Sequence, residues 1–568
     1  MKRFRNMFKE WLFKQKTLYF YFLVVMMVPT LLLLGTESMS AIVATAFILL
    51  PLSLYAVVLS VVRKPGIIFG ILLPIHLLGA FQLVLLYLFG GSIIATDMFL
   101  NVCTTNSMEI LELLDKLLPP IIGVILLYVP ALVLAVYSIR SSEKLSPCFQ
   151  VRTILSGIGL FLVGLAFTAW AYHKEPDFRV YRDIYPVNVL RNMKYAYIRW
   201  AASENYHETS KDFRFHAKST HDADCREIYV MVVGETSRPL NWGLYGYERN
   251  TTPRLSSMSN LVFFSDVLTQ SNATHKSVPL ILSAASAEEA DIIYSQKSVI
   301  TAFKEAGFKT VFFSNQRPNG SLIDFFAEEA DISLFLKQNV TDEKFNPYDE
   351  ELVKLLDRLL QEGDQKLFIV LHTYGSHFNY RERYPAEMAP YQPDNIDEVS
   401  FKMRQNLVNA FDNTIYYTDY ILGLIVDKLS ATGADAAMVY ISDHGEDLFD
   451  DNRKLFLHSS PVPDYYQIHV PFVIWMSDSY IVRYPQILSV AEQHRECAMS
   501  SQVVFHTLLS LGGVETPYRD EKLSVVDTLF TVLPRYYLND HNRPLSLDKA
   551  GLKPEDIEMF KRLHLVYP

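Results

Sequence analysis

Five long uncharged stretches fill the first third of the chain. They cover 17–35, 40–62, 66–92, 119–139 and 153–172. Each is near the roughly 20 residues that a helix needs to cross the hydrocarbon core of a membrane. No comparable stretch follows Tyr172. The pattern therefore predicts a transmembrane domain of five helices over 1–175. The first helix is expected to be an anchor, because it is not preceded by the features of a cleaved signal peptide.

Basic residues lie beside these stretches at alternate ends. The N-terminus is rich in Lys and Arg, and Arg63 and Lys64 separate the second and third stretches. Arg140, Lys144 and Arg152 separate the fourth and fifth. Because cytoplasmic loops carry the excess of positive residues, these segments are expected to be cytoplasmic. Five crossings then place the remainder of the chain outside.

Downstream of these stretches the chain alternates between short apolar runs and segments of helical period. The runs predicted as strands are 228–233, 309–313, 366–371, 437–441 and 470–475. The segments predicted as helices are 298–307, 348–361, 400–430 and 500–511. Such alternation predicts an α/β domain with a mostly parallel central sheet over 226–568. The tyrosine-rich and then polar segment 176–225 is expected to form a bridge near the membrane surface.

Charge and cysteine content argue against some classes of partner and metal site. The formal net charge is -10 and the predicted α/β domain has no cluster of Lys and Arg, which argues against a nucleic-acid partner. A lipid partner fits this composition better than a nucleic acid does. Of the four cysteines, Cys225 and Cys497 are the only pair near this domain, and no spacing resembles a thiolate metal site.

Chemically active side chains gather where the predicted strands end. Glu235 follows the first strand, and Asp443 and His444 follow the fourth. Ligands bind at the carboxyl ends of parallel strands, and this mixture of oxygen and imidazole suits zinc with one position open for a reacting group. An Asp-His-Gly triplet by itself is equally expected at a turn, so the metal interpretation depends on Glu235 lying beside it.

A loop rich in hydroxyl groups precedes a predicted helix at 278–286. It contains Ser271, Thr274 and Ser277. A hydroxyl held against zinc loses its proton more readily and becomes a nucleophile. Spacing does not choose among the three. The alternative is that they cap the helix, with Ser277 as the N-cap.

Six motifs carry a resemblance to a known family. They are VVGETSR, LYGYERNTTP, SNATHKSVP, LHTYGSH, AFDNTIYYTDYIL and ISDHGED. Over nearly its whole length the chain resembles the phosphoethanolamine transferases of Gram-negative bacteria, inner-membrane enzymes of the alkaline phosphatase and sulfatase superfamily with a periplasmic catalytic domain. The resemblance implies zinc ligands at Glu235, Thr274, Asp443 and His444. It also implies that Thr274, three residues before the SVP triplet, is the nucleophile that becomes modified.

Two further histidines match family positions that hold the phosphate or support the zinc. They are His377, after the third strand, and His458, after the Asp-His-Gly triplet. His469 and His76 are interpreted as structural, because the first alternates into a strand and the second lies in an apolar helix.

The residues directly after Glu235 have other expected roles. Thr236 and Ser237 are expected to cap the next segment. Arg238 is expected to pair with a nearby acid outside the site.

A polar stripe precedes the fourth membrane helix. Asn101, Thr105 and Glu109 are spaced by four residues and share one face of a helix. One interpretation is the exposed face of an interfacial helix. In the resembling family this spacing binds the phosphoethanolamine head group, which favours a donor-lipid site.

The predicted function is zinc-dependent transfer of phosphoethanolamine from phosphatidylethanolamine, through a covalent threonine intermediate, to a lipopolysaccharide acceptor, with a lipid A phosphate favoured. A core sugar or another periplasmic glycan is the alternative acceptor, because the chain lacks the cysteine after SVP and the several disulfides of better-known lipid A-modifying members. The rival activities are a phosphoglycerol transferase and a sulfatase-like hydrolase, and the rival class is a membrane-anchored sensor. We expect a monomer without a nucleic-acid partner.

Overall fold

The computed structural model describes residues 13–37, 39–80, 82–84, 93–104, 118–175, 178–221, 225–338, 340 and 345–567, without the side chains of 101–104. The chain divides into two compact units. The N-terminal unit is Met1–Val102 with Leu113–Ile198, and the C-terminal unit is Cys103–Glu112 with Arg199–Pro568.

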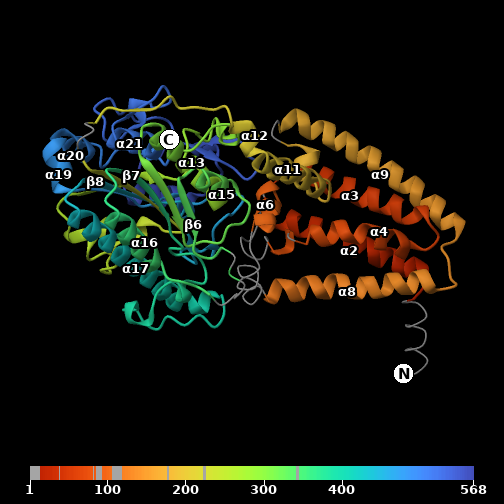
Figure 1. Cartoon of the computed structure of the whole chain (residues 1–568). Helices are drawn as coiled ribbons and strands as arrows, with labels where there is room; N and C mark the ends of the chain where they lie inside the picture. Colours follow the sequence, from red (N-terminus) through yellow and green to blue (C-terminus); the bar gives the residue numbers. More distant parts are fainter. Residues whose placement is uncertain are drawn as a thin grey trace. The chain divides into compact units, whose positions relative to one another are not determined.

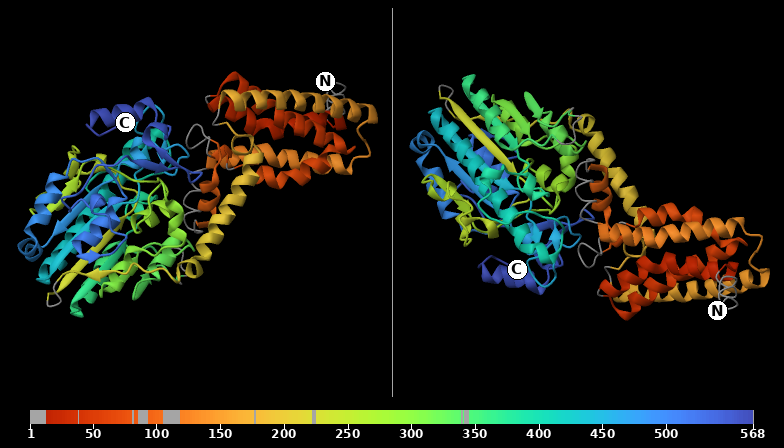
Figure 2. Two further views of the ribbon diagram at one scale, coloured as in Figure 1. Left: turned by 90° about the horizontal axis from the view of Figure 1, so that it is seen from above. Right: turned by 90° about the horizontal axis from the view of Figure 1, so that it is seen from below.

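Apolar helices make up the N-terminal unit. Among the described residues, four helices are long and apolar enough to cross a membrane: α2 (Gln15–Thr36), α3 (Ala41–Val61), α8 (Leu118–Arg140) and α9 (Pro147–Lys174). These helices run side by side in every view (Figures 1 and 2). Their outward faces are apolar, as at Leu126 and Leu162, which are 68% and 60% exposed. Lipid favours such a surface and water does not.

The third expected span is only partly described. Its first part is α4 (Pro65–Leu78), an apolar helix of 14 residues, or about 21 Å. This is shorter than the roughly 30 Å of hydrocarbon. Residues 81 and 85–92 of the expected span lie outside the described residues. In the part of this region that the structure describes, α4 is followed by α6 (Thr96–Thr104).

The C-terminal unit is an α/β domain built around a seven-stranded sheet (Figure 1). Its strands are β2 (Glu227–Gly234), β3 (Leu261–Phe264), β5 (Lys309–Ser314), β6 (Ile332–Phe335), β7 (Lys366–His372), β8 (Asp435–Ser442) and β11 (Phe472–Met476). The strand order is β3-β11-β8-β2-β7-β5-β6. Strands β8, β2, β7, β5 and β6 are parallel, and β11 is antiparallel to both of its neighbours. The expected mostly parallel sheet is confirmed.

Helices cover both faces of this sheet. The described α-helices after β2 are α13 (Thr274–Ile281), α14 (Val299–Glu305), α15 (Leu322–Ala327), α16 (Glu350–Gln361), α17 (Arg404–Ala431), α18 (Tyr465–Ile468), α19 (Asp478–Arg483), α20 (Pro485–Gln493), α21 (Val503–Leu511) and α22 (Pro554–Arg562). Helices α13 and α21 lie on one side of the sheet and α16 and α17 on the other (Figure 1). Burial on both faces explains why the strands are continuous apolar runs, and every residue of β2 is buried.

Short strand pairs lie around the sheet. They are β1 (Lys218–Ser219) with β13 (Val514–Glu515), β4 (Val267–Leu268) with β12 (Met499–Ser500), β9 (Asp447–Leu448) with β10 (Phe456–Leu457), and β14 (Tyr536–Leu538) with β15 (Pro544–Ser546). Cys225 and Cys497 are free thiols, so this pair forms no disulfide.

Two carboxylates hold the part of the expected bridging segment that belongs to the C-terminal unit. The segment contains α10 (Val180–Asp183), α11 (Val187–Glu204) and α12 (Tyr206–Ser210). Glu329 accepts hydrogen bonds from the Tyr206 hydroxyl and, at 2.7 Å, from Thr301 Oγ1. Glu305 accepts from the backbone N–H groups of Phe215 and Ala217, each at 3.1 Å. These bonds fix the chain that enters the α/β domain.

An aromatic stack holds α14 against the sheet and gives a stability prediction. The rings of Phe303 and Phe368 are parallel to within 5°, with centroids 3.9 Å apart, and both side chains are fully buried. Phe303→Ala leaves a cavity and is expected to destabilise the α/β domain by about 3–5 kcal/mol. The melting temperature of the purified protein measures this. Phe345→Ala, at a side chain that is 43% exposed, is the control, and an equal effect of both changes would contradict the assignment.

Candidate active site

The site starts where β2 ends. Glu235 follows this strand and is 1% exposed. Its Oε1 accepts a hydrogen bond from Thr236 Oγ1 at 2.6 Å, and its Oε2 accepts one from Gln316 Nε2 at 3.0 Å. Thr236 has a φ of 55°, which turns the chain so that its N–H donates to Asp443 Oδ1 at 2.9 Å. The ends of β2 and β8 are thereby joined.

Asp443 and His444 follow β8, the parallel neighbour of β2. Asp443 Oδ1 also accepts from the His444 N–H at 2.7 Å. Among the residues that the structure describes, Asp443 Oδ2 has no hydrogen-bond partner, and it lies 3.1 Å from His444 Nε2. His444 Nδ1 lies 3.0 Å from the Gly445 carbonyl oxygen, so Nδ1 carries the hydrogen and Nε2 presents its lone pair. A Cβ at Gly445 would collide with the Tyr466 carbonyl oxygen, which explains the glycine.

Thr274 reaches both His444 and Glu235 with its hydroxyl. It is the first residue of α13, and its Oγ1 lies 3.1 Å from His444 Nε2 and 3.5 Å from Glu235 Oε1. Ser277 points elsewhere, since its hydroxyl donates to the Ala273 carbonyl at 3.1 Å. The structure thus brings together the four side chains predicted to hold zinc.

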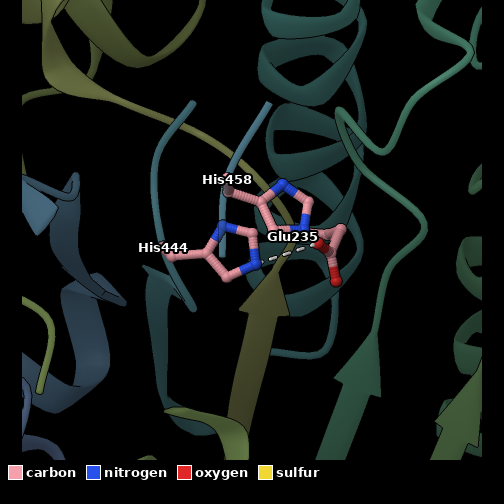
Figure 3. Close-up of side chains that lie close together, drawn as sticks. All are labelled: Glu235, His444 and His458. Atoms are coloured by element: carbon pink, nitrogen blue, oxygen red, sulfur yellow. Dashed lines mark ion pairs between the residues drawn. The ribbon is translucent and has the colours of Figure 1, made fainter. Parts of the chain in front are cut away.

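His458 lies against His444. The two rings have centroids 4.0 Å apart, and His458 Nδ1 lies 3.1 Å from Glu446 Oε2. One ring nitrogen of each histidine is turned toward Glu235 (Figure 3). Glu446 was missed by the sequence analysis, although it stands two residues after His444. Its position inside the ISDHGED motif was the only available signal.

His377 lies on the loop after β7. Its ring stacks on that of Tyr374, with centroids 5.1 Å apart. Its Nδ1 lies 2.6 Å from the Phe378 carbonyl oxygen and therefore carries the hydrogen. Burial lowers the pKa of His377 well below its usual value, and the charges of Arg383 and His458 lower it further. His377 is thus held as a neutral imidazole with its lone pair on Nε2.

The electrostatics of the centre fit a metal ion. Burial and, less strongly, Asp443 raise the pKa of Glu235 to about 8, and burial raises the pKa of Asp443 to about 7. Burial and the neighbouring His458 lower the pKa of His444 to about 4. A divalent cation removes this penalty, because it favours carboxylates and unprotonated imidazoles. Ligand atoms of Glu235, His444 and His458 lie within 4.8 Å of one another. This group of possible ligands includes His458, for which the family resemblance implied that it holds the phosphate or supports the zinc.

Several capping predictions were wrong. Ser277 is not the N-cap of its helix, because α13 begins at Thr274 and Pro279 fits inside its second turn. Thr236 and Ser237 do not cap the next segment, because the Thr236 hydroxyl bonds Glu235 and the Ser237 hydroxyl accepts the Trp242 indole N–H at 2.8 Å.

The structural roles expected of other residues agree with the geometry. Arg238 pairs with Asp450 through two hydrogen bonds, at 2.6 and 2.9 Å. His469 is buried and lies 2.6 Å from the Tyr465 hydroxyl. His76 is buried within α4.

The expected head-group stripe is not tested by the structure. Thr105 and Glu109 lie outside the described residues, and only the backbone of Asn101 is described, as part of α6. The stripe remains a prediction.

Comparison with known proteins defines the class. Residues 227–514 match the sulfatase family, and the chain belongs to that family. The resemblance to phosphoethanolamine transferases is confirmed: the Kdo(2)-lipid A phosphoethanolamine 7''-transferase of Escherichia coli K12 is 28% identical over 302 residues, which are 51% of each protein. The matched region spans about half the length of the curated relatives.

Two solved structures extend the comparison. The C-terminal periplasmic domain of EptC from Escherichia coli, in complex with Zn, is 25% identical with a TM-score of 0.55, covering 60% of this chain and 97% of that one. The integral membrane protein EptA from Neisseria meningitidis, a lipooligosaccharide phosphoethanolamine transferase, is 21% identical with a TM-score of 0.67. It covers 90% of this chain and 96% of that one, so its fold matches both units.

Proposed function

We propose that the protein transfers phosphoethanolamine from phosphatidylethanolamine to a lipopolysaccharide acceptor, as an inner-membrane enzyme with its C-terminal unit in the periplasm. One observation carries this proposal: the Thr274 hydroxyl lies within 3.5 Å of both Glu235 Oε1 and His444 Nε2 at the carboxyl edge of the sheet. The names of the relatives supply the transferred group.

Glu235, Thr274, Asp443 and His444 would hold zinc, and the relative's complex with Zn supports this choice of metal. When bound, zinc supplies a positive charge that eases loss of the Thr274 proton and offsets charge on the transferring group. His458 lies beside the same centre.

In the first step Thr274 Oγ1 attacks the phosphorus of phosphatidylethanolamine. A bond forms between Oγ1 and phosphorus, and the bond from phosphorus to the glycerol oxygen breaks. His458 takes the threonine proton and returns it to the glycerol oxygen, which leaves as diacylglycerol. Glu446, at 3.1 Å from Nδ1, orients the His458 ring for this transfer.

In the second step an oxygen of the acceptor attacks the same phosphorus. The bond to Thr274 Oγ1 breaks, and the phosphoethanolamine group passes to the acceptor. His377 takes the proton of the acceptor, because its neutral imidazole has a lone pair on Nε2. His377 gives up this proton, which passes to Thr274 Oγ1 as it leaves the phosphorus, and both residues return to their starting forms.

Asn101, Thr105 and Glu109 are proposed to hold the donor head group, with the Glu109 carboxylate facing the ammonium. The favoured acceptor is a lipid A phosphate, in keeping with the lipid A named for one relative. A core sugar is the alternative.

Mass spectrometry of lipid A and core oligosaccharide tests the function and the acceptor together. Cells that express the protein should carry phosphoethanolamine on lipid A, and cells without it should not. Addition to the core alone would move the acceptor to a sugar. No addition to either, from a protein that is folded in the membrane, would overturn the proposal.

A further inference from the structure

We propose that Arg383 is a positioning residue for His377, which fixes the direction of its imidazole ring. This inference rests on the proposed function, because that function gives His377 its task. It is carried by the contacts around the loop after β7.

The first contacts are hydrogen bonds from Arg383 to the backbone that carries His377. Arg383 Nε donates to the His377 carbonyl at 2.9 Å, and Nη2 donates to the Phe378 carbonyl at 3.0 Å. The Phe378 carbonyl also accepts from His377 Nδ1 at 2.6 Å. The guanidinium therefore holds the oxygen that sets the tautomer and the direction of the imidazole.

The second contact runs through Tyr374. The Arg383 guanidinium carbon lies 3.9 Å from the centroid of the Tyr374 ring, which stacks on His377. Lys337 Nζ lies 3.4 Å from the same centroid. Asn346 Oδ1 accepts from Lys337 Nζ at 3.1 Å and from Arg383 Nη1 at 3.2 Å, which joins the two cations. The stack is thus braced by two side chains, Lys337 and Arg383, that are 5% and 4% exposed.

Asp349 holds the start of the same loop. Its carboxylate accepts from the N–H groups of Tyr374 and Gly375 at 2.8 and 2.9 Å. The Ser376 N–H donates to the Glu235 carbonyl at 3.0 Å. The start of this loop is therefore fixed beside Glu235, and Arg383 fixes its other end.

The charges that face His377 act in one direction. They are the guanidinium of Arg383 and the ammonium group of Lys337, and each lowers its pKa, whereas the hydrogen bond to the Phe378 carbonyl raises it. A fixed guanidinium cannot lose its charge near neutral pH. Arg383 thus combines two effects, the hydrogen bonds that orient the ring and the charge that keeps it unprotonated.

Three variants of the full-length protein separate these effects. Arg383→Met removes both the bonds and the charge, whereas Arg383→Lys keeps the charge and removes the paired bonds. Lys337→Met removes one charge and keeps the bonds of Arg383. The control is Arg381→Met, two residues before Arg383, because Arg381 pairs with Asp394 at 3.3 Å and lies over the ring of Tyr384, whereas Arg383 lies over the ring of Tyr374.

The first readout does not depend on turnover. Diethyl pyrocarbonate modifies neutral imidazole, and peptide mass spectrometry of His377 as a function of pH gives the midpoint of its protonation. In the natural protein, the midpoint of His377 protonation should lie well below the ordinary histidine value of about 6.5. Arg383→Met should move the midpoint up toward that value, Lys337→Met should move it part of the way, and Arg383→Lys and Arg381→Met should leave it low.

The second readout is transfer of phosphoethanolamine. Both Arg383 variants should lose about 10- to 100-fold in kcat, with little change in KM for the donor, and Arg381→Met should be within about twofold of the natural protein. An unchanged midpoint and unchanged kcat in a folded Arg383→Met protein would overturn the inference. If Arg383→Met does not fold, an unchanged kcat in Arg383→Lys would overturn it. A natural protein without transferase activity would refute the proposed function, and the His377 midpoint would still test the positioning.

Discussion

Thr274→Ala is expected to abolish the covalent adduct and to lower transfer by about 10⁴-fold or more. The reason is geometric, because Thr274 is the hydroxyl that lies 3.1 Å from His444 Nε2 and 3.5 Å from Glu235 Oε1. Incubation of the purified protein with phosphatidylethanolamine, followed by peptide mass spectrometry, measures the adduct. Thr274→Ser keeps a hydroxyl and should retain part of the activity.

Ser277→Ala is the matched control for this change. Ser277 stands one helical turn away, and its hydroxyl donates to the Ala273 carbonyl rather than facing the ligands. Its adduct should form as in the natural protein. An adduct that persists in Thr274→Ala on another residue would show that the nucleophile is misassigned.

Asp443→Asn is expected to remove most of the bound zinc and, with it, activity by about 10³-fold. Asp443 Oδ1 is held by two backbone N–H groups, at 2.9 and 2.7 Å, which leaves Oδ2 as the oxygen available to a metal. The amide has the same shape without the charge, so the fold should persist. Metal analysis of the purified protein measures the loss.

Zinc binding should also appear as stability. An ion that binds only the folded state raises its melting temperature. Treatment with a chelator should lower the melting temperature of the natural protein, and added zinc should restore it. Asp443→Asn should respond to neither treatment, whereas Glu496→Gln, at an exposed position, should behave like the natural protein. Equal zinc content in Asp443→Asn and the natural protein would contradict the ligand assignment.

Much of the fold could be predicted because its signals are local. The apolar runs predicted as strands at 228–233 and 437–441 lie in β2 and β8. Buried parallel strands need apolar residues on both faces, so they can be recognised from such runs. Long uncharged stretches likewise became α2, α3, α8 and α9, because a helix in lipid must satisfy its own backbone. The helix near Thr274 was misplaced, because its first turn has no side-chain cap to mark it.

Parts of the site could not be predicted because they depend on distant partners. Glu446 and Arg383 act on histidines 12 and 6 residues away along the chain. The bond from Gln316 to Glu235 spans 81 residues. No periodicity or spacing encodes such contacts, since they arise from the way loops pack above the sheet.

The sequence by itself determined five of the seven strands of the sheet and four long apolar helices, and which acids and imidazoles stand at the strand ends. Strands β3 and β6 were not predicted. Hydrophobic period and turn chemistry are properties of neighbouring residues, so they can be read along the chain. Only the tertiary structure decided that β2 lies beside β8, that Thr274 rather than Ser277 faces His444, and that Arg383 holds the loop of His377. These outcomes depend on the order of strands in the sheet and on buried hydrogen bonds between loops, which form only when the whole domain has packed.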